Sequence, residues 1–265
     1  MKRRSLKAVV VLFCFALCGP AQAAEAVAAA RPDGLVLARQ VFDRERGQTT
    51  RSQSTMVLVN KQNKKRTRLF SSLRISQGGL ESTLIRFTSP ADIDGTGFLT
   101  IEKQGYETDQ FLFLPALSRR TRRIVSSQKH QRFVNSDFTY EDMERHPVED
   151  YTYKITGEKQ YQGLACWVLE TRPKPGTQSQ YTLTESLIAK QSLVPVFIRF
   201  FDKKNGLIKT YAVLKLDRID NIWTESIVLM ENKIKQHKTY LKINQIEYNR
   251  PIPADQVSKA ALEQY

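Results

Sequence analysis

Hydrophobic and polar positions alternate with a period of two along most of this chain, which is the pattern of β-strands. In residues 50–60, for example, Met56 and Leu58 fall on one face, and Val57 and Val59 fall on the other. A polar turn over 61–64 then separates this segment from an expected return strand. The same texture predicts strands over 50–60, 67–75, 80–88, 98–103, 110–114, 123–128, 151–160, 166–172, 180–188, 194–201, 208–218 and 222–232 with 239–248.

Helical periodicity is confined to two places. After Pro32, the residues Leu35, Ala38 and Phe42 recur at helical spacing and predict an amphipathic helix, and a shorter helix is expected near Phe138. Consecutive hairpins without long helices between them exclude a parallel α/β sheet. The sequence therefore predicts an α+β fold that is mainly β. We expect a half-open antiparallel barrel of about ten or eleven strands, with helices covering its concave face, because a long sheet curls as its strands twist.

The N-terminus has the layout of a secretory signal peptide. Four basic residues precede an apolar run over 8–17, and Ala21 and Ala23 form an A-x-A cleavage site. Cys14 and Cys18 each follow a large residue, whereas a lipid-anchoring site needs a small one. The sequence thus predicts a soluble periplasmic protein without a lipid anchor. Its expected parts are a signal peptide over 1–23, a disordered leader over 24–31 and a single domain over 32–265.

The cysteine and histidine positions argue against an enzyme. Once the signal peptide is removed, Cys166 is the one remaining cysteine, and its hydrophobic neighbours indicate a buried residue rather than a nucleophile. His130, His146 and His237 form no recognisable catalytic or metal-ligand spacing. No nucleotide-binding loop is apparent in the sequence. We therefore predict no catalytic residues, no metal site and no cofactor.

The chain is strongly basic, with 41 Lys and Arg against 27 Asp and Glu and a formal net charge of +14. In an exported protein the available polyanions are lipid head groups, so this charge favours an anionic membrane surface over nucleic acid. Plain solubility explains the same charge equally well, and loop lysines often protect sheet edges. The candidate docking surface is Lys61, Lys64, Lys65, Arg66 and Arg68.

Apolar residues between positions 98 and 117, together with later strands, supply candidates for a ligand cavity. A large antiparallel barrel leaves an apolar interior that its own side chains do not fill. For any single residue, however, a packed core is the more frequent explanation of hydrophobicity. The candidate lining residues are Phe98, Leu99, Ile101, Phe111, Phe113, Leu114, Leu117, Phe200, Trp223, Ile227 and Leu229.

A cluster of arginines follows this apolar stretch, at Arg119, Arg120, Arg122 and Arg123. Guanidinium groups this close together need anions between them, and the candidates are Asp137, Glu141 and Asp142. Asp137 is expected to cap a helix, while Glu141 and Asp142 would form either a structural latch with the arginines or a gate that opens on ligand entry. The simpler alternative to a latch or gate is that these acids cap a helix and that Glu141 pairs with Arg145 at i,i+4. An acid/base pair is unconvincing, because adjacent helical positions diverge.

Three motifs occur in a fixed order in this part of the chain. They are DGTGFL at 94–99, LPAL at 114–117 followed by the arginines, and SDF at 136–138 followed by YED at 140–142. This order resembles the outer-membrane lipoprotein-sorting family, the LolA-like periplasmic carriers, and in particular a branch associated with RND-type exporters. One position departs from the pattern, because Asn135 stands where a small residue, usually Gly, is expected. The resemblance implies the same half-open barrel fold.

Two functions from different classes remain open. The first is a periplasmic carrier that binds the acyl chains of a lipoprotein or lipid and ferries it from the inner towards the outer membrane. At about 0.8 kcal/mol per buried CH₂, transfer of a roughly sixteen-carbon chain out of water gains on the order of 12 kcal/mol. A protein cavity can match the gain that the bilayer gives but hardly exceed it. Directed transfer therefore needs an energised partner, and the resemblance implies an ATP-driven or RND-type inner-membrane exporter. The alternative is a non-carrier accessory or scaffold subunit of an RND-type exporter, with a filled barrel.

Overall fold

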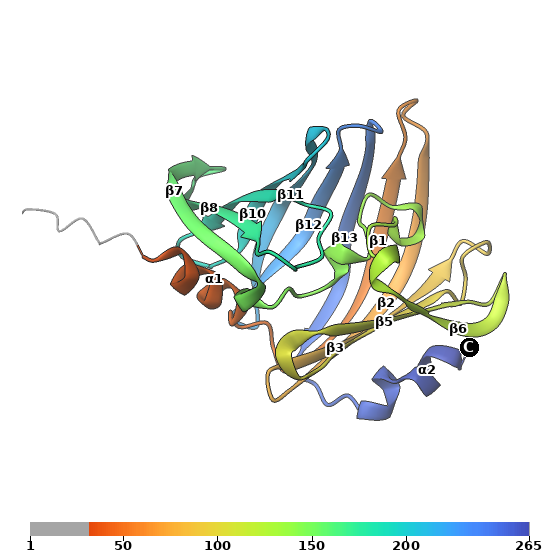
Figure 1. Cartoon of the computed structure of the whole chain (residues 1–265). Coiled ribbons are helices and arrows are strands. Elements are labelled where there is room, and N and C mark those ends of the chain that lie inside the picture. The colour runs from red at the N-terminus through yellow and green to blue at the C-terminus, as the bar shows by residue number, and fades with distance from the viewer. Residues whose placement is uncertain (1–31, 265) are drawn as a thin grey trace, which may run out of the picture. The chain divides into compact units, whose positions relative to one another are not determined.

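The computed structural model describes residues 32–264, which form one antiparallel sheet of thirteen strands that curls into a half-open barrel (Figure 1). The predicted fold class is confirmed. The expected signal peptide with Ala21 and Ala23, and the expected leader, lie outside the described residues. The strands are β1 (Thr49–Val59), β2 (Lys65–Gln77), β3 (Leu80–Ser89), β4 (Gly97–Glu102), β5 (Thr108–Leu114), β6 (Ser118–Ile124), β7 (Tyr151–Tyr161), β8 (Leu164–Pro173), β9 (Leu183–Ala189), β10 (Pro195–Asp202), β11 (Gly206–Ile219), β12 (Ile222–Asn232) and β13 (His237–Tyr248).

The first and last strands meet in the middle of the sheet. The strand order is β6-β5-β4-β3-β2-β1-β13-β12-β11-β10-β9-β8-β7, so β6 and β7 are the two edges although they follow each other in sequence. The segment over 125–150 joins these two edges and lies inside the curved sheet (Figure 1). We call this segment the roof. It consists of short 3-10 helices and turns, and the short helix expected near Phe138 is a 3-10 helix at Glu141–Met143.

The sheet has thirteen strands, more than the predicted ten or eleven, although each observed strand overlaps a segment expected from the sequence. The run over 222–248 is a hairpin of two long strands that pair from Ile227 with Lys242 to Asn232 with His237. The edge strand β6 begins at Ser118, five residues before the predicted segment over 123–128. Its arginines come in two adjacent pairs on an edge strand, where charged side chains are compatible with strand structure because one side of the strand faces solvent.

The core is divided between the two faces of the sheet. On the inner face, Phe98, Leu112 and Phe87 are fully buried and pack against Phe133 and Tyr140 of the roof. These strand residues alternate with the outer-face residues, which form a separate cluster: Leu84, Leu99, Phe111 and Phe113 with Leu262. The sheet is therefore buried on both faces in this region, which explains why its strands are hydrophobic at successive positions.

The two helices lie on different faces of the sheet. Helix α1 (Gly34–Phe42) begins at Asp33, whose carboxylate accepts hydrogen bonds from the backbone of Leu35 and Val36, and it packs on the inner face of β7 to β9. Helix α2 (Lys259–Glu263) packs on the outer face instead, through the fully buried Leu262. Only α1 therefore matches the expectation that helices cover the concave face. Within residues 32–264, neither helix is long and apolar enough to cross a membrane.

The second glycine of the DGTGFL motif, Gly97, makes room for α2. A Cβ on Gly97 would lie 2.5 Å from Cδ1 of Leu262. Arg86 of β3, which pairs with Gly97, donates hydrogen bonds to the backbone carbonyls of Ala261 and Leu262, at 2.7 and 2.9 Å. The first of the three motifs therefore holds the C-terminal helix against the sheet.

Replacing Gly34 by Ala is expected to lower the free energy of unfolding by about 1–3 kcal/mol, as overpacking does. A Cβ on Gly34 would lie 2.8 Å from the carbonyl carbon and oxygen of Tyr153, and this backbone has no freedom to move aside. The matched control is Gly157→Ala in β7, where a Cβ meets nothing within 4 Å. Urea unfolding of both variants measures the difference. Equal midpoints for the two would show that α1 does not pack tightly on β7.

Candidate functional site

A cavity of about 500 Å³ lies between the roof and the inner face of the strands from β7 to β12. Its wall is mainly aromatic and apolar, and the roof closes one side of it through Phe138 and Met143. A volume of this size is typical of small-molecule sites. The other lining residues are Arg44, Glu141, Asp142, Glu144, His146, Tyr151, Tyr153, Thr171, Pro173, Ser179, Tyr181, Leu183, Thr184, Ser186, Pro195, Ile198, Phe200, Tyr211, Glu225 and Met230.

Aromatic packing anchors the roof on the sheet at one end. The ring of Phe133 lies 4.8 Å from that of Phe98 and 6.0 Å from that of Tyr140, between centroids. The fully buried Gln110 of β5 donates a hydrogen bond of 2.7 Å to the backbone carbonyl of Tyr140. Between Phe133 and Tyr140 in the sequence, Asn135 has a φ of 61°, a left-handed conformation that favours Gly and that Asn tolerates better than most residues. This explains why a Gly is expected at this position and why Asn can replace it.

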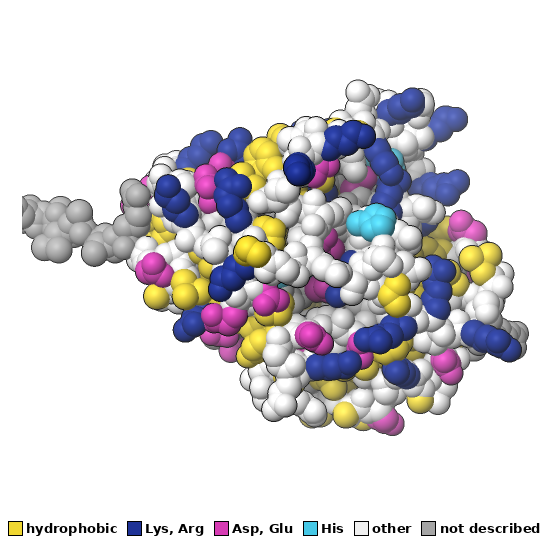
Figure 2. Space-filling view, viewed as in Figure 1, with side chains coloured by type: hydrophobic (Ala, Val, Ile, Leu, Met, Phe, Trp, Pro, Cys, Tyr) yellow, Lys and Arg dark blue, Asp and Glu magenta, His cyan; other side chains and the backbone are white. Residues whose placement is uncertain are grey.

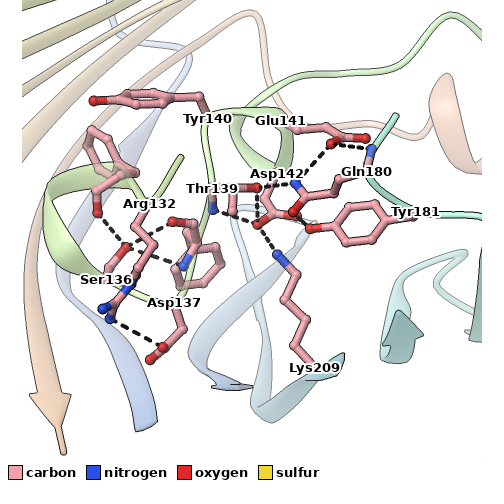
Figure 3. Close-up of polar contacts among 12 residues, drawn as sticks. Arg132, Ser136, Asp137, Thr139, Tyr140, Glu141, Asp142, Gln180, Tyr181 and Lys209 are labelled. Carbon is pink, nitrogen blue, oxygen red and sulfur yellow. Dashed lines mark hydrogen bonds and ion pairs between the residues drawn. The ribbon is translucent and has the colours of Figure 1, made fainter. Parts of the chain in front are cut away.

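Asp142 is the centre of a buried polar network that fixes the roof over the cavity (Figure 3). Its carboxylate pairs with the ammonium group of Lys209 on β11, and the two side chains are only 6% and 3% exposed. It also accepts hydrogen bonds from the Thr139 hydroxyl and the Tyr181 hydroxyl, both at 2.8 Å. Burial, followed by the charge of Asp142, raises the pKa of Tyr181, so this phenol stays protonated and donates.

Glu141 ties the roof to the loop that follows β8. Its carboxylate accepts hydrogen bonds from the backbone N–H of Gln180 at 3.1 Å, from the Gln180 side chain at 2.8 Å, and from the Ser179 hydroxyl. The residue is 4% exposed. Figure 3 shows Glu141 directed towards Gln180 and away from Asp142. The two adjacent acids therefore hold two different parts of the fold to the roof.

Asp137 joins the roof to β13. Its fully buried carboxylate accepts a 2.7 Å hydrogen bond from the Thr239 hydroxyl and lies 2.6 Å from Nδ1 of His237. Arg132 of the roof lies 3.4 Å from the other carboxylate oxygen. The role of Asp137 is thus to connect two segments a hundred residues apart, and its side chain caps no helix.

The acids expected to form a latch with the arginine cluster, Asp137, Glu141 and Asp142, contact other residues instead. Arg123 pairs with Asp109, Arg122 approaches the Tyr140 hydroxyl, and Arg120 is exposed. The Arg119 side chain lies outside the described part. The physical reason is topological, because β6 is an edge strand whereas the buried acids face β11, β13 and the loop over 179–181. Lys209, a lysine within an apolar strand, was the signal in the sequence that pointed to the true partner.

The predicted cavity residues are divided among several environments. Phe200 lines the cavity, and Phe98 and Leu114 pack with the roof. Leu99, Ile101, Phe111 and Phe113 pack under α2 on the outer face, Trp223 packs beside the core, and Leu117 is 82% exposed. Ile227 and Leu229 alternate with Val228 and Met230, so they fall on the face opposite Met230, which lines the cavity. A shift of one residue along a strand changes the face, which is why hydrophobicity alone did not identify the lining.

The predicted docking residues separate in a similar way. Lys61, Lys64, Lys65 and Arg66 are exposed around the β1–β2 turn. Arg68 is 5% exposed and donates a hydrogen bond to the backbone carbonyl of Val134 in the roof. It pairs across the sheet with the buried Met56, so the period of two places it on the inner face. Burial lowers the pKa of Arg68.

A polar groove of about 700 Å³ adjoins the apolar cavity. The two share Glu144, His146 and Tyr151 as lining residues, so an apolar space continues into a polar one at these side chains. The groove carries both signs of charge, with Arg123, Lys129, Arg145 and Lys174 among its basic residues and Glu107, Asp109, Glu149 and Asp150 among its acids. Such an arrangement suits an amphiphile with an apolar tail and a polar head.

His146 is expected to make the protein less stable below about pH 6.5. Burial lowers its pKa from the ordinary 6.5, an effect that the charges of Glu141 and Asp142 oppose. Unfolded His146 therefore binds a proton that folded His146 does not, and stability falls as the pH drops below 6.5. The expected loss is at most about 1.4 kcal/mol per pH unit. Urea unfolding at pH 7.5 and pH 5.0 tests it against His146→Gln, and an equal loss in both proteins would contradict the assignment.

Comparisons with known proteins agree with this architecture. A family model described as an uncharacterized protein matches residues 79–264. A DUF1329 family protein from Desulfovibrio piger is 29% identical, with a TM-score of 0.81, covering 86% of this chain and 97% of that one. A putative outer membrane lipoprotein-sorting protein domain from Vibrio parahaemolyticus is 28% identical, with a TM-score of 0.80, covering 87% and 98%. A LolA superfamily protein from Nitrosomonas europaea shares the fold at 15% identity, with a TM-score of 0.68, covering 87% and 100%. No curated protein matches the sequence.

Proposed function

We propose that this chain, which belongs to the family whose model matches residues 79–264 and which resembles a putative outer membrane lipoprotein-sorting protein domain, is a periplasmic carrier of an acylated amphiphile. The observation that carries the proposal is the continuity of the apolar cavity with the polar groove at Glu144, His146 and Tyr151. The acyl chains of a lipid or lipoprotein would occupy the cavity, and its head group would lie in the groove. The chain would move such cargo from the inner towards the outer membrane.

The cavity supports a carrier better than a catalyst. Two of the acids that line it, Glu141 and Asp142, are hydrogen-bonded or paired with Gln180, Tyr181 and Lys209, so their hydrogen-bonding capacity serves the fold. The rest of the wall is mostly apolar or aromatic, and of its other charged residues Arg44 pairs with Glu225 at 3.3 Å. Burial is what an acyl chain needs, at about 0.8 kcal/mol per CH₂.

The energy balance constrains the partner of such a carrier. Burial of an acyl chain in the cavity gains about the free energy that the chain loses when it leaves the bilayer, on the order of 12 kcal/mol for a roughly sixteen-carbon chain. Loading from a membrane is therefore close to neutral. Directed transport then requires an energised inner-membrane exporter, either ATP-driven or of the RND type. The basic N-terminal segment ending at Ala21 and Ala23 would direct export to the periplasm.

Titration with a fluorescent fatty acid tests the proposal. The protein without residues 1–23 is expected to bind the probe at one saturable site, and a natural phospholipid with two acyl chains is expected to displace it. Absence of saturable binding in delipidated protein would reject the carrier. It would favour the alternative of an accessory or scaffold subunit of an RND-type exporter.

A further inference from the structure

Three neighbouring hairpin turns place a dense basic surface on one rim of the sheet. The turns connect β1 with β2, β12 with β13 and β10 with β11, and these strands are consecutive neighbours in the order β2-β1-β13-β12-β11-β10. Segments 60–66, 202–206 and 231–238 together hold nine Lys or Arg and two acids. We call this surface the basic rim. Figure 2 shows Lys and Arg side chains gathered at the upper right, where these turns lie in Figure 1.

The charge of the basic rim is poorly neutralised by the protein itself. Glu231 pairs with Lys233 at 2.6 Å and Lys238 at 3.7 Å, while Asp202 accepts hydrogen bonds from the backbone of its own turn. Among residues 32–264, the other rim cations form no ion pair within 4.0 Å: Lys61, Lys64, Lys65, Arg66, Lys203, Lys204 and Lys235. Like charges held close together repel one another and so destabilise the fold, and a bound anion relieves this repulsion.

The opposite rim is different, which argues against a general need for solubility. Three of its turns, counted with similar flanks over 76–81, 188–196 and 218–223, together hold two basic residues and two acids. The turns at 78–79 and 220–221 are exposed as those of the basic rim are, whereas Ser192 and Val194 of the turn over 188–196 are buried. Lysines that served only solubility would be spread over both rims. Their concentration on one rim therefore favours a surface that binds an anion.

The composition of the basic rim identifies the kind of anion. Eight of its nine cations are lysines, which act as mobile point charges, whereas specific recognition of carboxylates or phosphates by a folded partner favours the fork of arginine. The middle turn also presents Ile234, which is 59% exposed. Several lysines around one exposed apolar side chain is the pattern of a surface that rests on anionic lipid head groups.

We propose that the basic rim docks on an anionic phospholipid membrane, with Ile234 entering the interface. Docking in this orientation brings one end of the cavity close to the bilayer. Phe200 and Leu183 line the cavity, and in the sheet register Leu183 pairs with Phe201, next to Asp202 of the rim. The proposal concerns where the protein sits on a membrane, and it holds whether or not the cavity carries lipid.

Sedimentation with vesicles tests the proposal on the protein without residues 1–23. The wild type is expected to bind vesicles that contain phosphatidylglycerol and to bind pure phosphatidylcholine weakly. Each basic residue contributes about fivefold to such binding, so reversing Lys61, Lys64, Lys203 and Lys235 to Glu is expected to weaken it by more than about 100-fold. The matched control reverses four exposed cations on other surfaces that have no ion pair, namely Arg51, Lys154, Lys159 and Lys242. The control is expected to lose less than a tenth of that effect, because charges far from the surface are screened over about 8 Å at physiological salt.

A second pair of variants separates the apolar contact from the charge. Ile234→Ser is expected to weaken vesicle binding about tenfold, whereas Leu214→Ser, at a position 43% exposed on β11, is expected to leave it unchanged. Equal loss in the two charge-reversal variants would show a non-specific effect of net charge and overturn the proposal. Wild-type protein that ignores anionic vesicles but binds an acidic protein through the rim would overturn it as well.

Discussion

Replacing Asp142 by Asn is expected to lower the free energy of unfolding by about 3–5 kcal/mol, one of the two largest effects of single substitutions that we predict. The change leaves the ammonium group of Lys209 buried without a counter-charge, since this side chain is 3% exposed. For a domain of this size the loss corresponds to a decrease of about 6–20 °C in the melting temperature. Thermal unfolding followed by circular dichroism measures it.

Two further variants show whether the effect comes from the buried pair. Asp255→Asn removes an acid from an exposed position near the C-terminus and is expected to change stability by less than about 0.5 kcal/mol. Combining Asp142→Asn with Lys209→Met removes the unpaired charge, so the double variant is expected to recover more than half of the loss. A double variant that is as unstable as the sum of the single changes would mean that the two residues do not interact.

The sheet itself could be predicted from the sequence, because its signal is local. Alternation along each strand and turn residues such as Asn205 and Gly206 are visible in a few consecutive positions. The order of the motifs identified the family for the same reason. What local patterns do not contain is the pairing of β1 with β13, which joins strands about 190 residues apart and brings β6 and β7 to the two edges.

The residues that line the cavity could not be predicted, because the lining depends on which face of each strand points inwards. A bulge between Phe200 and Phe201 and two more in β11 shift the register, so counting by twos from one strand to the next fails. The partners of Asp142 and Glu141 were missed for a related reason. Lys209 and Gln180 lie 67 and 39 residues away from them, whereas the arginine cluster is near in sequence and distant in the fold.

A tryptophan in place of Ser186 is expected to reduce the affinity for a fluorescent fatty acid at least about tenfold, because its ring occupies the space that an acyl chain would fill. Ser186 lines the cavity from β9 and is 8% exposed. Stability is expected to change little, since a bulky side chain that enters a cavity displaces no packed atom. Titration of both proteins with the same probe measures the change.

The control for this substitution places a tryptophan outside the cavity. Thr156 lies on β7 with its side chain exposed, and Thr156→Trp is expected to leave fatty acid binding within about twofold of the wild type. Thr184→Phe, a smaller increase in volume on the cavity wall, is expected to have an intermediate effect. If Ser186→Trp and Thr156→Trp bound the probe equally well, the acyl chain would have to lie elsewhere.

The most direct test of a carrier is the lipid that the protein already holds when it is purified. Mass spectrometry of a solvent extract of the protein without residues 1–23, expressed with an added export signal, is expected to find acylated lipid at close to one molecule per chain. The same extract from Ser186→Trp is expected to contain less than about a tenth as much. Wild-type protein without lipid, or equal amounts of lipid in the two proteins, would contradict the proposal that this cavity carries an acylated amphiphile.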